Sequence, residues 1–183
     1  MKIKEGVIQD ATFITAEPGH QKVDEPRGPE AKTRRNKEGE WAKKGGKSHY
    51  GCKLHSKMDI DYGLIREIET TPSSIHDSQI DLTKPGELAY RDRGYLGASC
   101  KGHNATMNRA TRSHPLSTKD KKLNKRITRK RAPSERPYVV IKNIFHSGHV
   151  KVTTTLRTHT KNIFTCFCYN LLQLITLKQK NTT

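Results

Sequence analysis

Three charged residues in the segment RAPSERPYVVIK have types and a spacing that can carry chemistry: Arg131, Glu135 and Lys142. On an α-helix the seven-residue interval between Glu135 and Lys142 is about two turns, so both side chains would lie on one face. One acid and one base would then point outward together. The alternative is an ordinary solvated helix surface, where such pairs are common.

Two further carboxylates occur in segments with strand character, where aspartate is uncommon. Asp10 lies within the β-forming run GVIQDATFI, and Asp92 ends the strand-like segment that begins at GELAYR. An ionised carboxylate in a sheet costs free energy unless it is paired or bound to a metal ion. The alternatives are an exposed sheet-edge acid for Asp10, and a surface salt bridge with Arg91 or Arg93 for Asp92.

Magnesium can supply the missing compensation, because it is a hard cation that prefers carboxylate oxygens and keeps waters for substrate phosphates. Two such ions about 4 Å apart can activate a water or a 3′-hydroxyl on one side of a phosphorus atom and stabilise the leaving oxygen on the other. Three carboxylates suffice for this, and Asp10, Asp92 and Glu135 are the candidates.

The charge of the chain favours a polyanionic partner. The 183 residues carry a formal net charge of +17, with a sequence pI near 9.9. The cations occur in runs, in KTRRNK, WAKKGGK and KDKKLNKRITRKR, which is typical of a surface that follows phosphates. A solvated basic surface is the alternative. The length fits one ordinary domain, residues 1–183.

The four cysteines lack the spacing of a zinc site, and we assign them no function. Neither an apolar run long enough to cross a bilayer nor a signal-peptide hydrophobic region is evident in the sequence. These patterns predict a cytoplasmic protein with reduced thiols and no membrane partner.

The order of elements follows from residue pattern and turn signals. We expect a strand over residues 7–14, an extended loop over about 15–46, a hairpin over about 48–71, and a strand ending at Asp92. Between the hairpin and that strand, Ser74 can start a short helix with Asp77 capping its first turn. A further short helix is possible over residues 106–111.

Two helices are expected in the last third of the chain. Ser134 is a plausible N-cap for a helix that continues through Phe145, and Pro137 argues against an earlier start. The position of Arg131 relative to Glu135 is therefore left open. The segment 156–178 has a helical stripe that we expect to be buried in the core, formed by Ile163, Phe167, Leu171 and Leu174.

Several motifs, taken in order, resemble the catalytic core of an insertion-sequence transposase of the DDE type, in the group named after insertion sequences four and five. They are VIQDATFI, KKGGKSHYGCKLHSKMDIDYGLI, TTPSSIHDSQ, AYRDRGYLG, KRAPSERPYVVIK and GHVKVTTTLR. The resemblance implies an α/β, RNase-H-like mixed sheet flanked by helices. It also implies Mg²⁺-dependent cleavage and transfer of DNA strands, with two ions that Mn²⁺ can replace.

By the same resemblance, Asp10, Asp92 and Glu135 are the catalytic acids and the metal ligands. Arg131 and Lys142 match the signature cations around the glutamate and are expected to contact DNA. We include the cations Arg91 and Lys130 among the DNA-binding candidates, and these complete the set of seven predicted site residues. The implied partners are transposon terminal inverted repeats and target DNA, with a homodimer assembled on DNA in the nucleoid.

Two differences from the family pattern shape the expected function. Thr128 stands where the family signature has a tyrosine that could stack on a base. The first acid is at position 10, whereas family members generally carry a helical DNA-binding region before it, so we expect a truncated copy without that region. The alternative function is a catalytically inactive, nucleic-acid-binding remnant. A small RNA-binding protein would explain the charge but not the three acids.

Overall fold

The core of the computed structural model is a mixed β-sheet; the structure describes residues 5–19, 35–113 and 115–182. Within these residues seven strands join the sheet: β1 (Val7–Ala16), β2 (Glu40–Lys44), β3 (Lys47–Asp59), β4 (Ile65–Pro72), β5 (Leu88–Arg91), β6 (His103–Thr106) and β7 (His149–Val150). The strand order is β2-β3-β1-β5-β6, with β4 paired to β3 and β7 paired to β1.

Strands β1, β2, β3 and β4 are joined by antiparallel pairing, and β5, β6 and β7 are added in parallel. Strand β3 pairs antiparallel with β1, with Asp10 opposite Ser56, and also with β4 in the predicted hairpin. Strands β5 and β6 then run parallel to β1. Asp92 follows directly after β5, as predicted.

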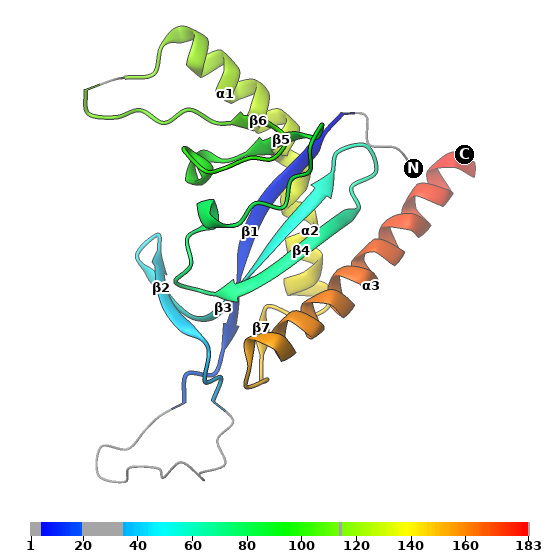
Figure 1. Ribbon diagram of the computed structural model, residues 1–183. Coiled ribbons are helices and arrows are strands. Elements are labelled where there is room, and N and C mark those ends of the chain that lie inside the picture. Colours follow the sequence, from blue (N-terminus) through cyan, green and yellow to red (C-terminus); the bar gives the residue numbers. More distant parts are fainter. Residues whose placement is uncertain (1–4, 20–34, 114, 183) are drawn as a thin grey trace.

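The helical elements are α1 (Thr118–Arg131), α2 (Glu135–Val139), α3 (Thr155–Thr182), a π-helical turn η4 (Val140–Ile144) and three 3₁₀ turns, η1 (Asp77–Gln79), η2 (Arg93–Tyr95) and η3 (Ala132–Ser134). Helices α1 and α2 pass behind the sheet in the view of Figure 1, and α3 runs alongside β4. An α/β mixed sheet flanked by helices is thus confirmed, and it is consistent with the RNase-H-like fold.

Alternation along β1 separates two environments, because successive side chains of a strand point to opposite faces. Ile8 packs with Ile127 of α1, and Ile14 packs with Ile141 of η4 and Tyr169 of α3. The intervening residue Asp10 therefore points toward the same helical layer.

The other face of the sheet is covered by the segment after β4. The Gln9 amide donates to the carbonyl of Ile80 at 2.6 Å, and the ammonium of Lys53 donates to the carbonyl of Ile75 at 2.7 Å. These contacts hold η1 and the loop after it against the strands.

The prediction of a loop over residues 15–46 is wrong at both ends. Strand β1 continues to Ala16, and β2 forms a hairpin with β3; residues 20–34 of the expected loop lie outside the described part of the chain. The reason is the Gly45-Gly46 turn, whose φ angles of 57° and 80° match the two-residue turns that connect antiparallel strands.

The expected helix at residues 106–111 is also absent from the structure. Thr106 instead ends strand β6, and Asn108 is tied to α1 by reciprocal hydrogen bonds with Asn124. These contacts between segments satisfy backbone groups that a local helix would otherwise pair.

Ser134 holds the expected N-cap position before α2, but its side chain makes no capping hydrogen bond and its backbone is already helical, because helical structure begins well before it. Helix α1 starts at Ser117, whose hydroxyl and Asp120 form a capping box, and η3 leads from α1 directly into α2. Pro133 and Pro137 do not end this helical run; they coincide with a 3₁₀ turn and a short α-helix that passes into a π-helical turn. A proline removes one helical hydrogen bond, and the irregular turns accommodate that loss.

Asp77 is not the cap of a helix begun by Ser74. His76 is the N-cap of η1, and its side chain accepts the N–H of Ser78. The Asp77 carboxylate instead accepts from the Lys53 ammonium at 2.8 Å. Lys53 is almost fully buried, and a buried ammonium requires a counter-charge.

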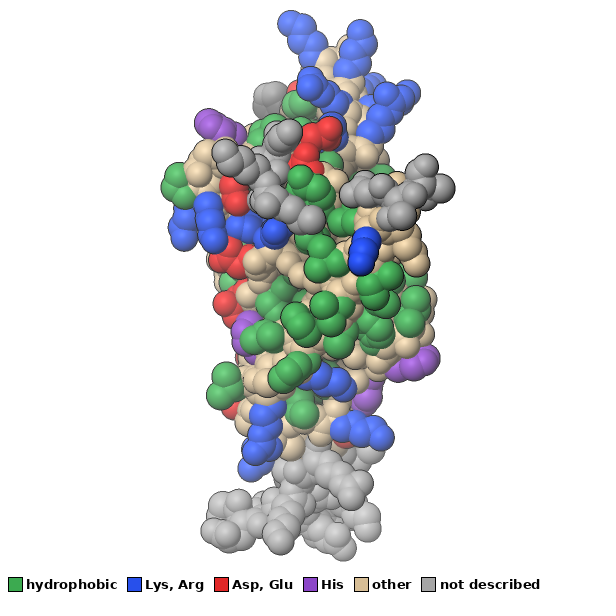
Figure 2. Space-filling view, turned by 90° about the vertical axis from the view of Figure 1, so that its right-hand side faces the viewer, with side chains coloured by type: hydrophobic (Ala, Val, Ile, Leu, Met, Phe, Trp, Pro, Cys, Tyr) green, Lys and Arg blue, Asp and Glu red, His purple; other side chains and the backbone are tan. Residues whose placement is uncertain are grey.

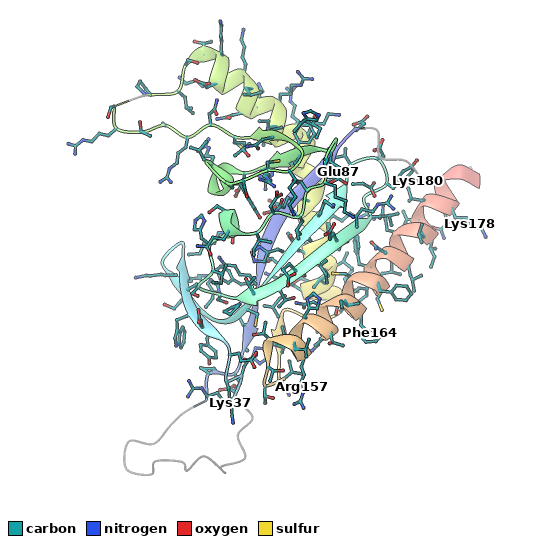
Figure 3. All side chains as sticks on the ribbon, in the orientation of Figure 1. Lys37, Glu87, Arg157, Phe164, Lys178 and Lys180 are labelled. Atoms are coloured by element: carbon teal, nitrogen blue, oxygen red, sulfur yellow. The ribbon has the colours of Figure 1, made fainter. Side chains whose placement is uncertain are left out.

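Helix α3 confirms the predicted helix, but the expected buried stripe is exposed. Figure 2 shows hydrophobic side chains gathered on this face, and Figure 3 shows Phe164 turned away from the sheet. The exposed apolar residues include all four members of the predicted stripe: Ile163, Phe167, Leu171 and Leu174. The buried face is more polar, since Asn162 donates to the Thr70 hydroxyl at 3.0 Å. Among the described residues, no helix combines the length and apolarity needed to cross a membrane.

Replacing Ile141 with alanine tests the packing of η4 on the sheet. Ile141 is fully buried among the strands and α3, so Ile141→Ala should lower the free energy of unfolding by about 2–5 kcal/mol in urea titrations followed by circular dichroism. Ile144→Ala is the matched control, because Ile144 lies in the same turn and is 61% exposed. Equal losses for the two variants would contradict this packing.

Candidate functional site

Asp10 lies on β1 at the point where this strand separates from β5. The two strands pair through Val7 with Ala89 and through Ile8 with Tyr90. Asp10 and Asp92 each come two residues after the Ile8–Tyr90 pair. The two carboxylates therefore lie at the same level, Asp92 just past the end of β5 and Asp10 within β1 where its pairing with β5 ends. Active sites of open α/β sheets commonly occur at the carboxyl ends of parallel strands.

The Asp10 carboxylate is held from the helical side. One oxygen accepts the Nη2–H of Arg131 at 2.9 Å and the hydroxyl of Ser134 at 3.2 Å. The other oxygen accepts the backbone N–H of Ala11 at 2.9 Å. The position of Arg131, which the sequence leaves open, is thus toward Asp10.

Burial raises the pKa of Asp10 above its ordinary value, because the carboxylate loses contact with water. The positive charge of Arg131 opposes this rise, while the negative charge of Asp92 adds to it. Asp10 and Asp92 therefore share one electrostatic environment. A cation between them would be stabilised by both.

Asp92 is oriented by the turn that follows it. Its carboxylate accepts the backbone N–H of Gly94 at 2.8 Å and thereby caps η2. This hydrogen bond uses one carboxylate oxygen. In the part of the chain that the structure describes, Arg91 pairs with Asp81, and neither Arg91 nor Arg93 forms the alternative surface salt bridge with Asp92.

Glu135 is the first residue of α2 and is exposed to solvent. It lines a hollow of about 260 Å³ together with Asp10 and Arg131. It also lines a neighbouring hollow with Tyr138 and Lys142, so Glu135 and Lys142 share one face, as their seven-residue spacing predicts. Glu135 thus lies between Asp10 and Lys142.

The three acids do not form a closed metal cluster. In the described part of the chain, no group of three His, Cys, Asp or Glu side chains is arranged to hold a metal ion. Their donor chemistry nevertheless fits a hard divalent cation, since carboxylate oxygens are its preferred ligands. The raised pKa of Asp10 reflects mainly its burial, which Arg131 only partly offsets, and to a lesser degree the negative charge of Asp92.

Arg91 is not available to contact DNA, and its prediction as a DNA-binding residue is wrong. Its side chain is fully buried. The guanidinium pairs with Asp81 and donates to the Gln9 side-chain oxygen and the Ser99 carbonyl, both at 2.8 Å. A cation this deep in the fold binds internal partners, since burial without them would be costly.

The other predicted cations lie at the surface of the site. Lys130 is partly exposed and forms an ion pair with Glu5. Lys142 is half-buried, and burial lowers its pKa. The charge of Lys44, on β2, lowers the pKa of Lys142 further, so these two ammonium groups lie close enough to repel.

Helix α1 contains the basic run KDKKLNKRITRKR, which the sequence marks only by its charge. Only Asn124 and Ile127 of this helix are buried. The side chains of Lys and Arg project from this end of the molecule in Figure 2. The exposed cations are Lys119, Lys121, Lys122, Lys125, Arg126 and Arg129. Helix α1 therefore presents a strongly positive surface that leads to Arg131.

Sequence reasoning missed two contributors to the site. Ser134 was interpreted as a helix cap, although it binds Asp10. Lys44 was noted only as part of a basic run, although it acts on Lys142 across the fold. No local sequence signal identifies either contact, because each joins residues about a hundred or more positions apart.

Two acids where the parallel pairing of β1 with β5 ends, a helical glutamate and a mixed α/β sheet are consistent with the RNase-H-like class of domain. The chain belongs to the transposase DDE domain family, whose sequence profile matches residues 2–171. A similar curated protein is the transposase for insertion sequence element IS1106 of Neisseria meningitidis serogroup B, with 23% identity over 151 residues. That match covers 76% of this chain and 52% of the relative, so the chain spans about half the relative's length. No solved structure matches significantly.

Removing Arg131 tests the electrostatics of Asp10. Arg131→Ala should raise the pKa of Asp10 further, because the cation that opposes burial is lost; a ¹³C NMR titration of the carboxyl carbon measures this. Ser134→Ala is the matched comparison and should shift the pKa less in the same direction, since its hydrogen bond has the smaller effect. An unchanged Asp10 pKa in Arg131→Ala would contradict the ion pair.

The same change should alter how stability depends on pH. The folded-state pKa of Asp10 lies above its ordinary value of 3.8, so the folded state binds this proton more tightly than the unfolded state. The contribution of Asp10 to stability therefore falls as the pH rises from about 3.8 through the folded-state pKa. In urea titrations, the free energy of unfolding should fall over a wider range of pH in Arg131→Ala than in the wild type.

Replacing Arg91 distinguishes a structural from a DNA-binding role. Arg91→Ala should lower the free energy of unfolding by about 3–5 kcal/mol, because Asp81 loses its buried partner. Arg93→Ala, at an exposed neighbouring position, should change it by less than about 0.5 kcal/mol. If Arg91→Ala kept wild-type stability and only weakened DNA binding, the structural assignment would be wrong.

Proposed function

We propose that this chain carries the catalytic domain of an insertion-sequence transposase, which cleaves DNA strands and transfers them to new sites. Membership of the transposase DDE domain family supports DNA as the substrate. The observation that carries the proposal is the register of β1 and β5, which brings Asp10 and Asp92 to the same level, with Glu135 in the hollow that Asp10 lines.

Asp10, Asp92 and Glu135 are the residues that would hold two Mg²⁺ ions, or Mn²⁺ in their place. When bound, these ions supply activation of a water or 3′-hydroxyl and stabilisation of the leaving oxygen. Arg131 keeps Asp10 in its ionised form and fixes its orientation through the 2.9 Å hydrogen bond. Ser134 limits the rotation of the same carboxylate.

Positively charged groups on both sides of the acids position the DNA backbone. Lys142 and Lys44 repel one another in the free protein, so a phosphate between them would relieve that repulsion. Helix α1 continues the positive surface beyond Arg131 and can follow the duplex through phosphate contacts. Terminal inverted repeats and target DNA are the proposed partners, with two copies assembling on DNA in the nucleoid.

A second candidate is a DNA-binding remnant without catalysis. The observation that favours it is the lack of a closed three-acid cluster among the described residues. Arg131 also occupies one oxygen of Asp10, so binding of a metal ion there would need the arginine to share or leave that position.

Nicking of supercoiled plasmid DNA separates the two candidates without knowledge of the terminal sequences. The wild type should nick the plasmid in Mg²⁺ or Mn²⁺ and not in EDTA. Asp92→Asn should lower the rate about 100-fold or more, equivalent to about 3 kcal/mol of lost transition-state stabilisation. Asparagine can still accept the Gly94 N–H, so the turn after β5 is retained.

Glu69→Gln is the control acid, because Glu69 is exposed on β4 and lies outside the hollows that Asp10 and Glu135 line. It should nick as the wild type does. Salt-sensitive DNA binding by the wild type without nicking in either metal would establish the remnant instead. The stability of wild type and Asp92→Asn with added Mg²⁺ gives a separate readout, since only the wild type should gain thermal stability.

A further inference from the structure

A third hollow, of about 440 Å³, has Asp92 in its lining and does not include Glu135. Its walls come from β1, β2, the segment after β4 and the turn η2. Its lining includes Phe13, Trp41, Lys43, Lys44, Lys53 and Asp92. This volume is in the range of sites that hold small organic molecules. Of the residues that line this hollow, the function proposed above uses only Asp92 and Lys44.

Aromatic rings form one part of the lining. Trp41 on β2 is 59% exposed, although tryptophan is costly to leave in water. Its ring contacts Tyr50 with centroids 5.2 Å apart and a tilt of 56°. Phe13 stacks flat on His49, with centroids 4.4 Å apart. The hollow thus offers a supported aromatic surface to a ligand.

Cations form another part of the lining. The Lys53 ammonium lies 5.3 Å from the centre of the Phe13 ring, and that of Lys44 lies 6.0 Å from it. Lys53 is already paired with Asp77, so its charge is offset. Lys43 and Lys44 are exposed at the end of β2, and their charges remain available to an anion.

This combination identifies the chemical class of the ligand. An aromatic plane beside exposed ammonium groups suits a flat ring attached to an anionic group, which is the description of a nucleotide. The hollow adjoins Asp92, so the nucleotide would belong to the strand that meets the acids. A base inside a duplex is stacked and paired, and a hollow in the protein can accept it only when it is unpaired.

We propose that this hollow binds an unpaired base of the DNA strand, with Trp41 stacking on the base and the cations of β2 contacting its phosphate. The proposal rests on the proposed function, because it takes the DNA strand at Asp92 as given. In this proposal the β2–β3 hairpin binds DNA whose strands have separated near the cleavage point.

Trp41 is the only tryptophan of the chain, so its fluorescence reports this site directly. We would titrate single-stranded oligothymidylate into the protein in EDTA, where cleavage does not occur. The base should quench Trp41 fluorescence when it stacks. An abasic oligonucleotide of the same length should bind through its phosphates with little quenching. Equal quenching by both oligonucleotides would overturn the proposal.

Variants measure the contribution of stacking to affinity, with anisotropy of labelled oligonucleotides as the readout. Trp41→Ala should weaken binding of oligothymidylate about 5- to 150-fold, as expected for the loss of one stacked base. Trp41→Phe should keep most of the wild-type affinity for oligothymidylate. The abasic oligonucleotide should bind both variants as tightly as it binds the wild type. Circular dichroism should show the native fold in both, since Trp41 is largely exposed. Wild-type affinity of Trp41→Ala for oligothymidylate would also overturn the proposal.

Asp92→Asn separates the failure of this proposal from the failure of the proposed function. Quenching that persists in Asp92→Asn, together with a wild type that does not nick DNA, would keep the base-binding site and reject the enzyme. Nicking by the wild type without base-dependent quenching would keep the enzyme and reject the site. If thymidine monophosphate alone quenched as strongly as the oligonucleotide at equal concentration, the site would be one for free nucleotides, and the assignment to the DNA strand would be wrong.

Discussion

The structure of this domain depends on the compensation of one negative charge, the carboxylate of Asp10 on the central strand. Burial disfavours this charge, and Asp92 on the adjacent strand disfavours it further. The compensation comes from Arg131, at the end of α1, more than a hundred residues away. Packing of Ile127 against Ile8 brings α1 to the strand and so places Arg131. The hydrophobic contact and the ion pair therefore support the same docking of helix on sheet.

Strand register provides the second constraint on the site. Strand β5 runs parallel to β1 and pairs with it through Val7–Ala89 and Ile8–Tyr90, and the two strands separate beyond the second pair. Asp10 and Asp92 flank the resulting gap. Asp10 shares a hollow with Glu135, which also shares one with Lys142, and Asp92 shares a hollow with Trp41. A strand of DNA at the acids would thus meet cations and an aromatic surface in succession.

The parts of the fold that the sequence predicted well are those set by local pattern. Alternation predicted β1 and the β3–β4 hairpin, and helical periodicity predicted α3. Strand β2 was missed because the Gly45-Gly46 turn was interpreted as part of a loop. The orientation of α3 was also wrong, since its apolar residues extend around most of the helix. Polar partners such as Thr70 decide which of its faces meets the sheet.

The sequence by itself determined the chemistry available to this protein: three acids in family order, an excess of positive charge, and motifs that matched the transposase DDE domain family. Only the tertiary structure decided which charges meet. It buried Arg91 with Asp81, turned Arg131 toward Asp10, and placed Lys44 near Lys142. The physical reason is that these contacts join segments distant in sequence. Their geometry follows from sheet register and helix packing, which local residue preferences do not specify.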